Sequence, residues 1–136
     1  MMLEDQLKKN WFFRHTGAFS VKKNSKSIIE SLIYAAELLQ NPGNLITYFP
    51  QGQFESINIE KLHFEKGVEW LIKNLKNEVQ VVFLASQVDY FESAKPHLFI
   101  HFETYDYREK KIQELEDDYN KFYRSSSLKN IKLKDS

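Results

Sequence analysis

The stretch from Val79 to Ala85 constrains the fold most strongly. It is dominated by β-branched and apolar residues, and a run of this kind is typical of a strand that is buried on both faces. A second segment, His97 to Tyr105, alternates apolar and polar residues, which predicts a half-buried strand. The connection between them, Asp89 to Pro96, is short enough for a hairpin loop, so antiparallel pairing of these two strands stays open.

Helical spacing appears on either side of these strands. Ser27 and Glu30 form a capping-box signal, and a helix is predicted from there until Asn41-Pro42-Gly43 ends it. A second helix is expected to start at about Phe64, and a third is expected over roughly Arg108 to Arg124. Their apolar faces consist of Ile28, Leu32, Ala35, Ala36 and Leu39 in the first helix, of Phe64, Val68, Leu71, Ile72 and Leu75 in the second, and of Ile112, Leu115, Tyr119 and Phe122 in the third.

Two shorter extended segments complete the pattern, a brief strand at Phe19 to Val21 and a buried strand at Leu45 to Phe49. Strands that alternate with helices predict an α/β fold with a central mixed, partly parallel sheet flanked by helices. A chain of 136 residues fits one domain. We expect that domain to span residues 1–124 and a polar, frayed tail to span 125–136.

Charge and composition exclude several classes of function. The 19 basic residues balance the 19 acidic ones, so we expect no nucleic-acid partner. The chain has no cysteine, which rules out disulfides, thiolate catalysis and cysteine metal sites. No apolar run approaches the roughly 20 residues of a transmembrane helix, and Met1 to Asn10 lacks the apolar core of a signal peptide. A cytoplasmic location is expected, with peripheral contact at the inner face of the membrane.

The tetrapeptide Phe49-Pro50-Gln51-Gly52 is a candidate ligand loop. It follows an apolar run, its proline ends that run, and its glycine permits a tight turn. In open α/β sheets, ligands bind outside the carboxyl ends of the strands. The alternative interpretation is an ordinary turn after a strand.

Three short stretches follow one another in the order and spacing of a known enzyme family. Gly17-Ala18-Phe19 leads to Lys22-Lys23, Phe49-Pro50-Gln51-Gly52 comes next, and Phe64-Glu65-Lys66-Gly67 opens a helix. In these stretches the chain resembles the phospholipid/glycerol acyltransferases, across roughly Met1 to Val88. That family has a His-x4-Asp block, a glycine-aromatic block ending in a basic residue, a Phe-Pro-Glu-Gly block, and a Phe-x-x-Gly element at a helix start.

The chain departs from this pattern at several positions. Only 16 residues precede Gly17, and their single histidine, His15, has Ser20 five positions later where the family has aspartate. Gln51 replaces the family's glutamate, Lys23 replaces an arginine, and Phe54 stands where the family often has a phosphate-contacting arginine. The strand block also lacks its usual proline. We therefore expect an N-terminally incomplete acyltransferase-like domain, with Met1 and Met2 internal to a longer reading frame.

The resemblance implies a mechanism and a set of binding residues. In the family, a histidine oriented by an aspartate acts as the general base on an acceptor hydroxyl, which attacks the thioester of acyl-coenzyme A or acyl carrier protein. The implied partners are thus a lipid acceptor and an acyl thioester co-substrate, with no bound cofactor or metal and no catalytic residue in this chain. The implied substrate-binding residues are Gly17, Phe19, Lys22, Lys23, Phe49, Pro50, Gln51, Gly52, Lys66 and Gly67.

The basic residues before the first helix have two interpretations. Lys22 and Lys23 would hold the acceptor's phosphate, although lysine offers a point charge and no bidentate fork. A non-phosphorylated or unusual lipid acceptor is then more plausible than in the family at large. The alternative is a solvated basic turn.

Other histidines invite weaker interpretations. His101 and Asp106 have the His-x4-Asp spacing, but residues i and i+5 of a strand point to opposite faces, so we interpret the match as chance. His63 is interpreted as a residue at the entry of a helix. His97 and His101 share a strand face and would need Glu103 as a third ligand to hold a metal.

The aromatic cluster at Trp11, Phe12 and Phe13 lies among basic residues. It suits a membrane interface or the packing of a short helix end. If a preceding segment normally covers it, this surface would drive homo-oligomerisation.

Two further hypotheses compete with an incomplete enzyme. One is a complete, non-catalytic lipid or acyl-chain binding module on the same scaffold. The other is an unrelated α/β domain whose turns imitate the motifs.

Overall fold

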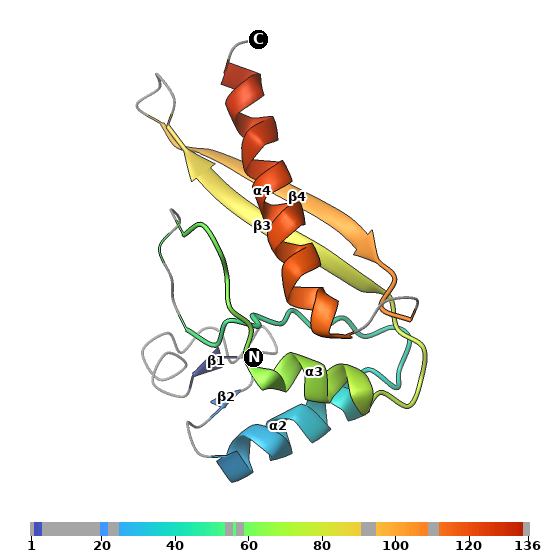
Figure 1. Cartoon of the computed structure of the whole chain (residues 1–136). Helices are drawn as coiled ribbons and strands as arrows, with labels where there is room; N and C mark the ends of the chain where they lie inside the picture. The colour runs from blue at the N-terminus through green and yellow to red at the C-terminus, as the bar shows by residue number, and fades with distance from the viewer. Residues whose placement is uncertain are drawn as a thin grey trace. The chain divides into compact units, whose positions relative to one another are not determined.

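The computed structural model describes residues 2–3, 20–21, 25–53, 56, 59–90, 95–108 and 112–134. The chain divides into two compact units (Figure 1). The first unit comprises Met1–Gly52 and Phe64–Val79, and the second comprises Gln53–His63 and Gln80–Ser136. Each candidate site below lies within one unit.

The first unit is built on two helices, α2 (Ser25–Leu38) and α3 (Lys66–Lys73). They lie side by side (Figure 1) and bury a small core of Leu32, Ala35 and Leu71 between them. All three residues belong to the apolar faces predicted from helical spacing. Further apolar side chains pack around this core, namely Ile28, Ala36, Ile46, Tyr48, Trp70 and Leu75.

Helix α2 begins before the predicted capping box and ends where the sequence indicates. Ser27 lies inside the helix, which begins at Ser25, and its carbonyl accepts a 2.9 Å hydrogen bond from the Ser31 hydroxyl one turn later. The prediction of Ser27 as N-cap is therefore wrong. Beyond Leu38 the side chain of Asn44 donates to the Leu38 carbonyl, and the Gly43 amide donates to Asn41 Oδ1. The first of these bonds satisfies one of the carbonyl groups that a helix C-terminus leaves without an intrahelical partner.

The segment Leu45 to Phe49 was predicted as a buried strand, and this is wrong. Residues 44–49 form no strand, and the run is not buried as a whole. Ile46 and Tyr48 pack on the helix core, whereas Leu45 is 91% exposed and Phe49 is 59% exposed. The side chains of this segment therefore alternate between packed and exposed positions, although the segment pairs with no strand.

A minimal parallel pairing involves the N-terminal part of the chain. Strand β1 (Met2–Leu3) pairs with strand β2 (Ser20–Val21), with Met2 opposite Ser20 and Leu3 opposite Val21. The brief strand expected near Phe19 to Val21 is confirmed at Ser20–Val21.

The second unit contains an antiparallel hairpin. Strand β3 (Val81–Asp89) pairs with β4 (His97–Tyr105) along its full length, from Val81 opposite Tyr105 to Asp89 opposite His97. The bounds predicted for the second strand are confirmed, and the hairpin alternative is the correct one. Strand β3 begins later than expected and continues to Asp89.

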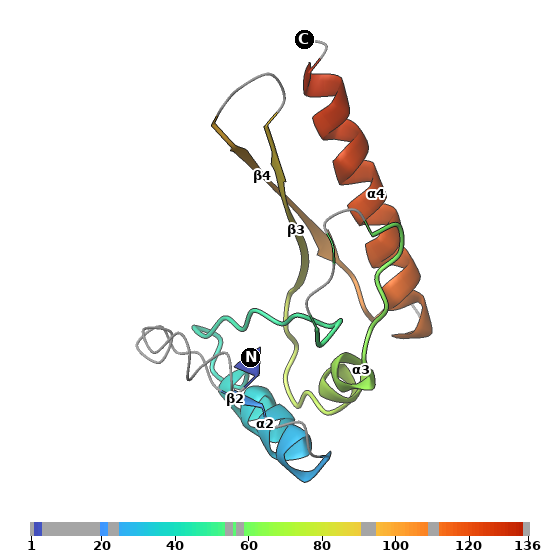
Figure 2. The ribbon, with the colours of Figure 1, turned by 90° about the vertical axis from the view of Figure 1, so that its left-hand side faces the viewer.

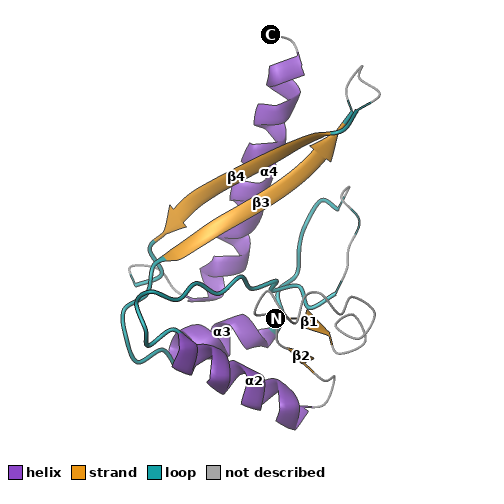
Figure 3. Ribbon diagram, turned by 180° about the vertical axis from the view of Figure 1, so that it is seen from behind, coloured by secondary structure: helices purple, strands orange, loops and turns teal. Residues whose placement is uncertain are grey.

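The hairpin is covered on one side by helix α4 (Leu115–Lys134), which follows the short 3₁₀ helix η2 (Ile112–Glu114) (Figures 2 and 3). Phe83 of β3 is central to this packing. Its ring stacks on Tyr105 at 4.5 Å and makes an edge contact with Tyr119 at 5.3 Å. The helix was expected to end near Arg124 and instead continues to Lys134, so the prediction of a frayed segment from residue 125 is wrong for 125–134.

These elements contradict the predicted fold class. The described strands form a two-stranded antiparallel sheet and a separate two-residue parallel pair. They do not form a central mixed, partly parallel sheet with helices on its faces. The physical reason is that Leu45 to Phe49 joins no sheet and that β3 pairs with the next strand through a short loop. In the part of the chain that the structure describes, no helix is both long enough and apolar enough to cross a bilayer.

Candidate functional site

The candidate site begins at the turn Phe49–Gly52 of the first unit. The Gly52 amide donates to the Phe49 carbonyl at 3.3 Å, which closes the turn. Gly52 has a φ of 66°, a conformation that glycine adopts without the steric cost of a side chain. Glycine at this position is therefore required by the turn itself.

The turn is attached to the start of helix α3. The Glu65 amide donates a 2.8 Å hydrogen bond to the Pro50 carbonyl, and Glu65 is the residue from which α3 begins. A Cβ on Gly52 would lie 3.0 Å from Glu65 Cγ and 3.9 Å from its carboxyl carbon. The Phe-Pro-Gln-Gly and Phe-x-x-Gly stretches of the sequence are thus held in direct contact. The Glu65 side chain also places a carboxylate close to this loop. In the same loop, Gln51 stands at the position where the acyltransferase pattern has glutamate.

This contact predicts the effect of a methyl group at Gly52. Gly52→Ala should lower the free energy of unfolding of the first unit by about 1–3 kcal/mol, because it forces an L-residue to positive φ. The 3.0 Å approach to the Glu65 side chain adds crowding. Urea unfolding followed by tryptophan fluorescence measures this, since both tryptophans belong to the first unit. Gly43→Ala is the control, because a Cβ there meets only Asn41 Oδ1, at 3.4 Å.

Tyr48 fixes the second contact between the loop and α3. A Cβ on Gly67 would lie 2.5 Å from the Tyr48 hydroxyl oxygen, so the phenol approaches the helix backbone only because residue 67 is glycine. Burial, and secondly the charge of Glu65, raises the pKa of Tyr48 from 10.0 to about 12. The phenol is therefore held in its neutral form beside the helix start.

The pKa of Tyr48 predicts how the first unit responds to alkaline pH. Its folded pKa lies above its unfolded value, so its contribution to stability is complete below pH 10 and is lost as the pH rises through about 12. We expect the urea midpoint to fall over this interval, and to fall less steeply in Tyr48→Phe. Equal slopes in the two proteins, measured by tryptophan fluorescence, would show that the phenol titrates normally.

The exposed part of this site combines an apolar ring, an amide and a cation. Phe49 is 59% exposed, Gln51 is half-buried, and Lys66 is exposed. Such a set can bind an acyl chain and a polar or anionic head group. The other predicted binding residues, Gly17, Phe19, Lys22 and Lys23, lie outside the described residues, as do His15, Phe54 and the Trp11 to Phe13 cluster.

The described histidines belong to the second unit. His101 Nε2 donates to Asn130 Oδ1 at 2.8 Å, whereas Asp106 accepts from the Arg108 amide at 3.1 Å. His63 Nδ1 lies 3.5 Å from Glu116 Oε1, and His97 stacks on Phe99. Among the residues that the structure describes, no group of three histidine or carboxylate side chains is arranged to hold a metal.

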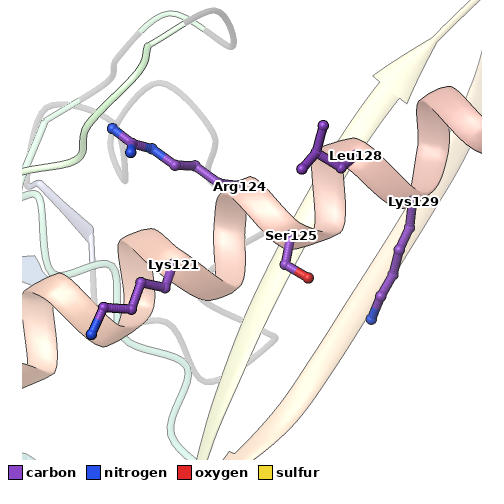
Figure 4. A pocket seen from close by; sticks show the side chains of 5 residues that line it. All are labelled: Lys121, Arg124, Ser125, Leu128 and Lys129. Atoms are coloured by element: carbon purple, nitrogen blue, oxygen red, sulfur yellow. The ribbon is translucent and has the colours of Figure 1, made fainter.

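Helix α4 carries a shallow hollow that the sequence patterns do not predict (Figure 4). Its lining residues are Lys121, Arg124, Ser125, Leu128 and Lys129. Lys121 pairs with Asp118 at 2.9 Å, and Arg124 Nε donates to the Glu60 carbonyl at 3.4 Å. The sequence does carry a signal, because residues 119–134 contain basic residues and no acidic ones. The same polar, lysine-rich composition also fits the frayed tail predicted from residue 125.

Comparison of the chain with protein-family models, curated proteins and solved structures finds no match. The resemblance to the acyltransferases therefore depends on the motifs and their order.

Proposed function

We propose that the first unit binds a glycerolipid-type acceptor at the surface formed by Phe49–Gly52 and the start of α3, as the acceptor-binding part of an acyltransferase-like domain. The observation that supports this is the 2.8 Å hydrogen bond from the Glu65 amide to the Pro50 carbonyl. It joins two motifs that are separate in the sequence and adjacent in the acyltransferase pattern.

The chemistry of the exposed residues suits a lipid with a polar head. The Phe49 ring offers apolar surface to an acyl chain, and Lys66 offers a positive charge to a phosphate or other polar head group. The Gln51 amide supplies both a donor and an acceptor for hydroxyl groups. An acyl thioester of coenzyme A or acyl carrier protein would be the co-substrate of the family reaction.

We infer that these 136 residues bind without catalysing transfer. No His-x4-Asp pair precedes Gly17 in the sequence, and a general base typically accelerates such a step by roughly 10²- to 10⁴-fold. The second candidate function, a non-catalytic lipid or acyl-chain binding module, has the same binding site. Acyl transfer from acyl-coenzyme A to a lysophospholipid, measured against heat-denatured protein, should stay at background.

The α4 hollow favours a position at the membrane surface. Lys121, Arg124 and Lys129 line this hollow together with Leu128, which is 60% exposed. Basic residues around an exposed apolar side chain suit the head-group region of an anionic bilayer. We propose peripheral contact of this kind on the cytoplasmic face.

Binding of a lysophospholipid below its micelle concentration tests the proposed site. We expect Phe49→Asp to weaken the affinity at least tenfold, because it replaces apolar contact with a charge that must be desolvated. Leu45→Asp is the matched control, since Leu45 is 91% exposed and outside the turn, and it should change the affinity less than twofold. Isothermal titration calorimetry measures both. Equal losses, or binding by neither the parent nor the variants, would reject the site.

A further inference from the structure

Figure 3 shows the side of the β3–β4 hairpin that lies away from α4. Exposed apolar residues make up this face of the hairpin. Alternate residues of the two strands point there, because side chains of a strand alternate between its faces. Phe83 and Ala85 point toward α4 and are buried, whereas the apolar residues between and beyond them are 46–74% exposed. The exposed set is Val82, Leu84, Val88, Leu98, Ile100 and Phe102.

The strand register makes these side chains one continuous patch. Leu84 lies opposite Phe102, and Val88 lies opposite Leu98. Between these pairs, Ser86 lies opposite Ile100 at the centre of the patch. No charged residue occupies these positions of the described hairpin. The exposed fractions correspond to about 600 Å² of apolar surface, which is at the upper limit of the patches normal for a monomer.

We propose that a second copy of this chain covers this hairpin face, forming a symmetric dimer. Two such faces would bury about 1,200 Å² in total, the lower end of the range for specific protein interfaces. Because each copy would present the same face, the contact closes as a two-fold dimer and does not propagate. Two apolar sheet faces commonly pack against each other, with a distance of about 10 Å between the two sheets.

The patch suits another sheet better than a lipid. It lies on a two-stranded sheet and includes no residue of the α4 hollow. It also carries no cation, so an anionic bilayer would be attracted to the basic α4 hollow instead. Because the patch is apolar and uncharged, the same patch on a second copy of the chain is complementary to it. This favours a second copy as the partner.

Sedimentation velocity over a range of concentrations tests the dimer. We expect a reversible monomer–dimer equilibrium, and we expect Phe102→Lys to raise its dissociation constant at least tenfold by burying a charge. Ile131→Lys is the matched control, because Ile131 is 60% exposed on α4, and it should change the constant less than twofold. Circular dichroism confirms that both variants fold.

Single cysteines identify the face directly, because the natural chain has none. Ser86→Cys should form an intermolecular disulfide under mild oxidation, since Ser86 lies at the centre of the patch. Ser125→Cys, exposed on α4, should form no disulfide-linked dimer under the same conditions. A monomer at all concentrations, an equally strong dimer in Phe102→Lys, or equal cross-linking through both cysteines would overturn the proposal.

Discussion

Replacing Asn120 by leucine should destabilise the second unit by roughly 2–4 kcal/mol, the largest effect expected of a single polar substitution in it. Asn120 is 6% exposed, and its side chain satisfies both backbone groups of Leu62. The Leu62 amide donates to Asn120 Oδ1 at 2.8 Å, and Asn120 Nδ2 donates to the Leu62 carbonyl at 2.9 Å. Leucine would leave these buried groups without a partner, which costs more than the loss of the bonds alone.

Urea unfolding followed by circular dichroism measures this loss, and amide hydrogen exchange at Leu62 locates it. We expect the Leu62 amide to lose protection in Asn120→Leu. Asn120→Asp is the informative second variant, since it keeps the acceptor for the Leu62 amide but removes the donor to the Leu62 carbonyl. Asn77→Leu, at an exposed asparagine that donates to the Gln40 carbonyl, should change stability by less than about 0.5 kcal/mol. A loss in Asn120→Leu no larger than in this control would contradict the account.

Replacing Gly67 by alanine should destabilise the first unit by about 1–3 kcal/mol through overpacking. Gly67 is the second residue of α3, so alanine would ordinarily stabilise the helix by roughly 0.5–1 kcal/mol. The opposite sign is expected because the new Cβ would lie 2.5 Å from the Tyr48 hydroxyl oxygen. The phenol ring is stiff and packs against the core around Leu32 and Leu71, so it cannot move away freely.

A double-mutant cycle separates these two effects. Tyr48→Phe removes the clashing oxygen, so Gly67→Ala should become neutral or stabilising in that background. The coupling free energy should therefore exceed about 1 kcal/mol, which is larger than additivity allows for independent sites. Urea unfolding followed by tryptophan fluorescence gives all four values. Equal effects of Gly67→Ala in both backgrounds would show that Tyr48 does not determine the requirement for glycine.

Periodicity predicted the elements whose apolar residues follow a regular spacing. The faces of α2 and α3 and the bounds of β4 follow from such patterns, whereas the hairpin alternative follows from the short connection between Asp89 and Pro96. The predicted end of helix α4, at Arg124, lies too early because two of the buried positions after it are polar. Ser126 is 1% exposed and Asn130 is 6% exposed, and Asn130 is satisfied by His101 and Gln87. Buried polar residues leave no hydrophobic stripe in a sequence.

The mistaken fold class has a different physical cause. Leu45 to Phe49 has the composition of a strand, but a strand also requires a partner, and composition does not reveal one. The candidate site was predicted in part. Pro50, Gly52 and Gly67 were selected from their motifs, whereas the role of Tyr48 depends on a contact with a residue 19 positions away. The pairing of Asn120 with Leu62 spans 58 positions and involves backbone atoms, so no side-chain pattern signals it.

We propose that Phe49–Gly52 and the start of α3 form one lipid-binding surface. The most direct test of this proposal is a two-dimensional NMR titration of ¹⁵N-labelled protein with a lysophospholipid below its micelle concentration. We predict that the amides of Gly52, Glu65 and Gly67 shift together with one saturable dissociation constant, and that Phe49→Asp abolishes these shifts. Shifts confined to the second unit, or none at saturating lipid, would contradict the claim.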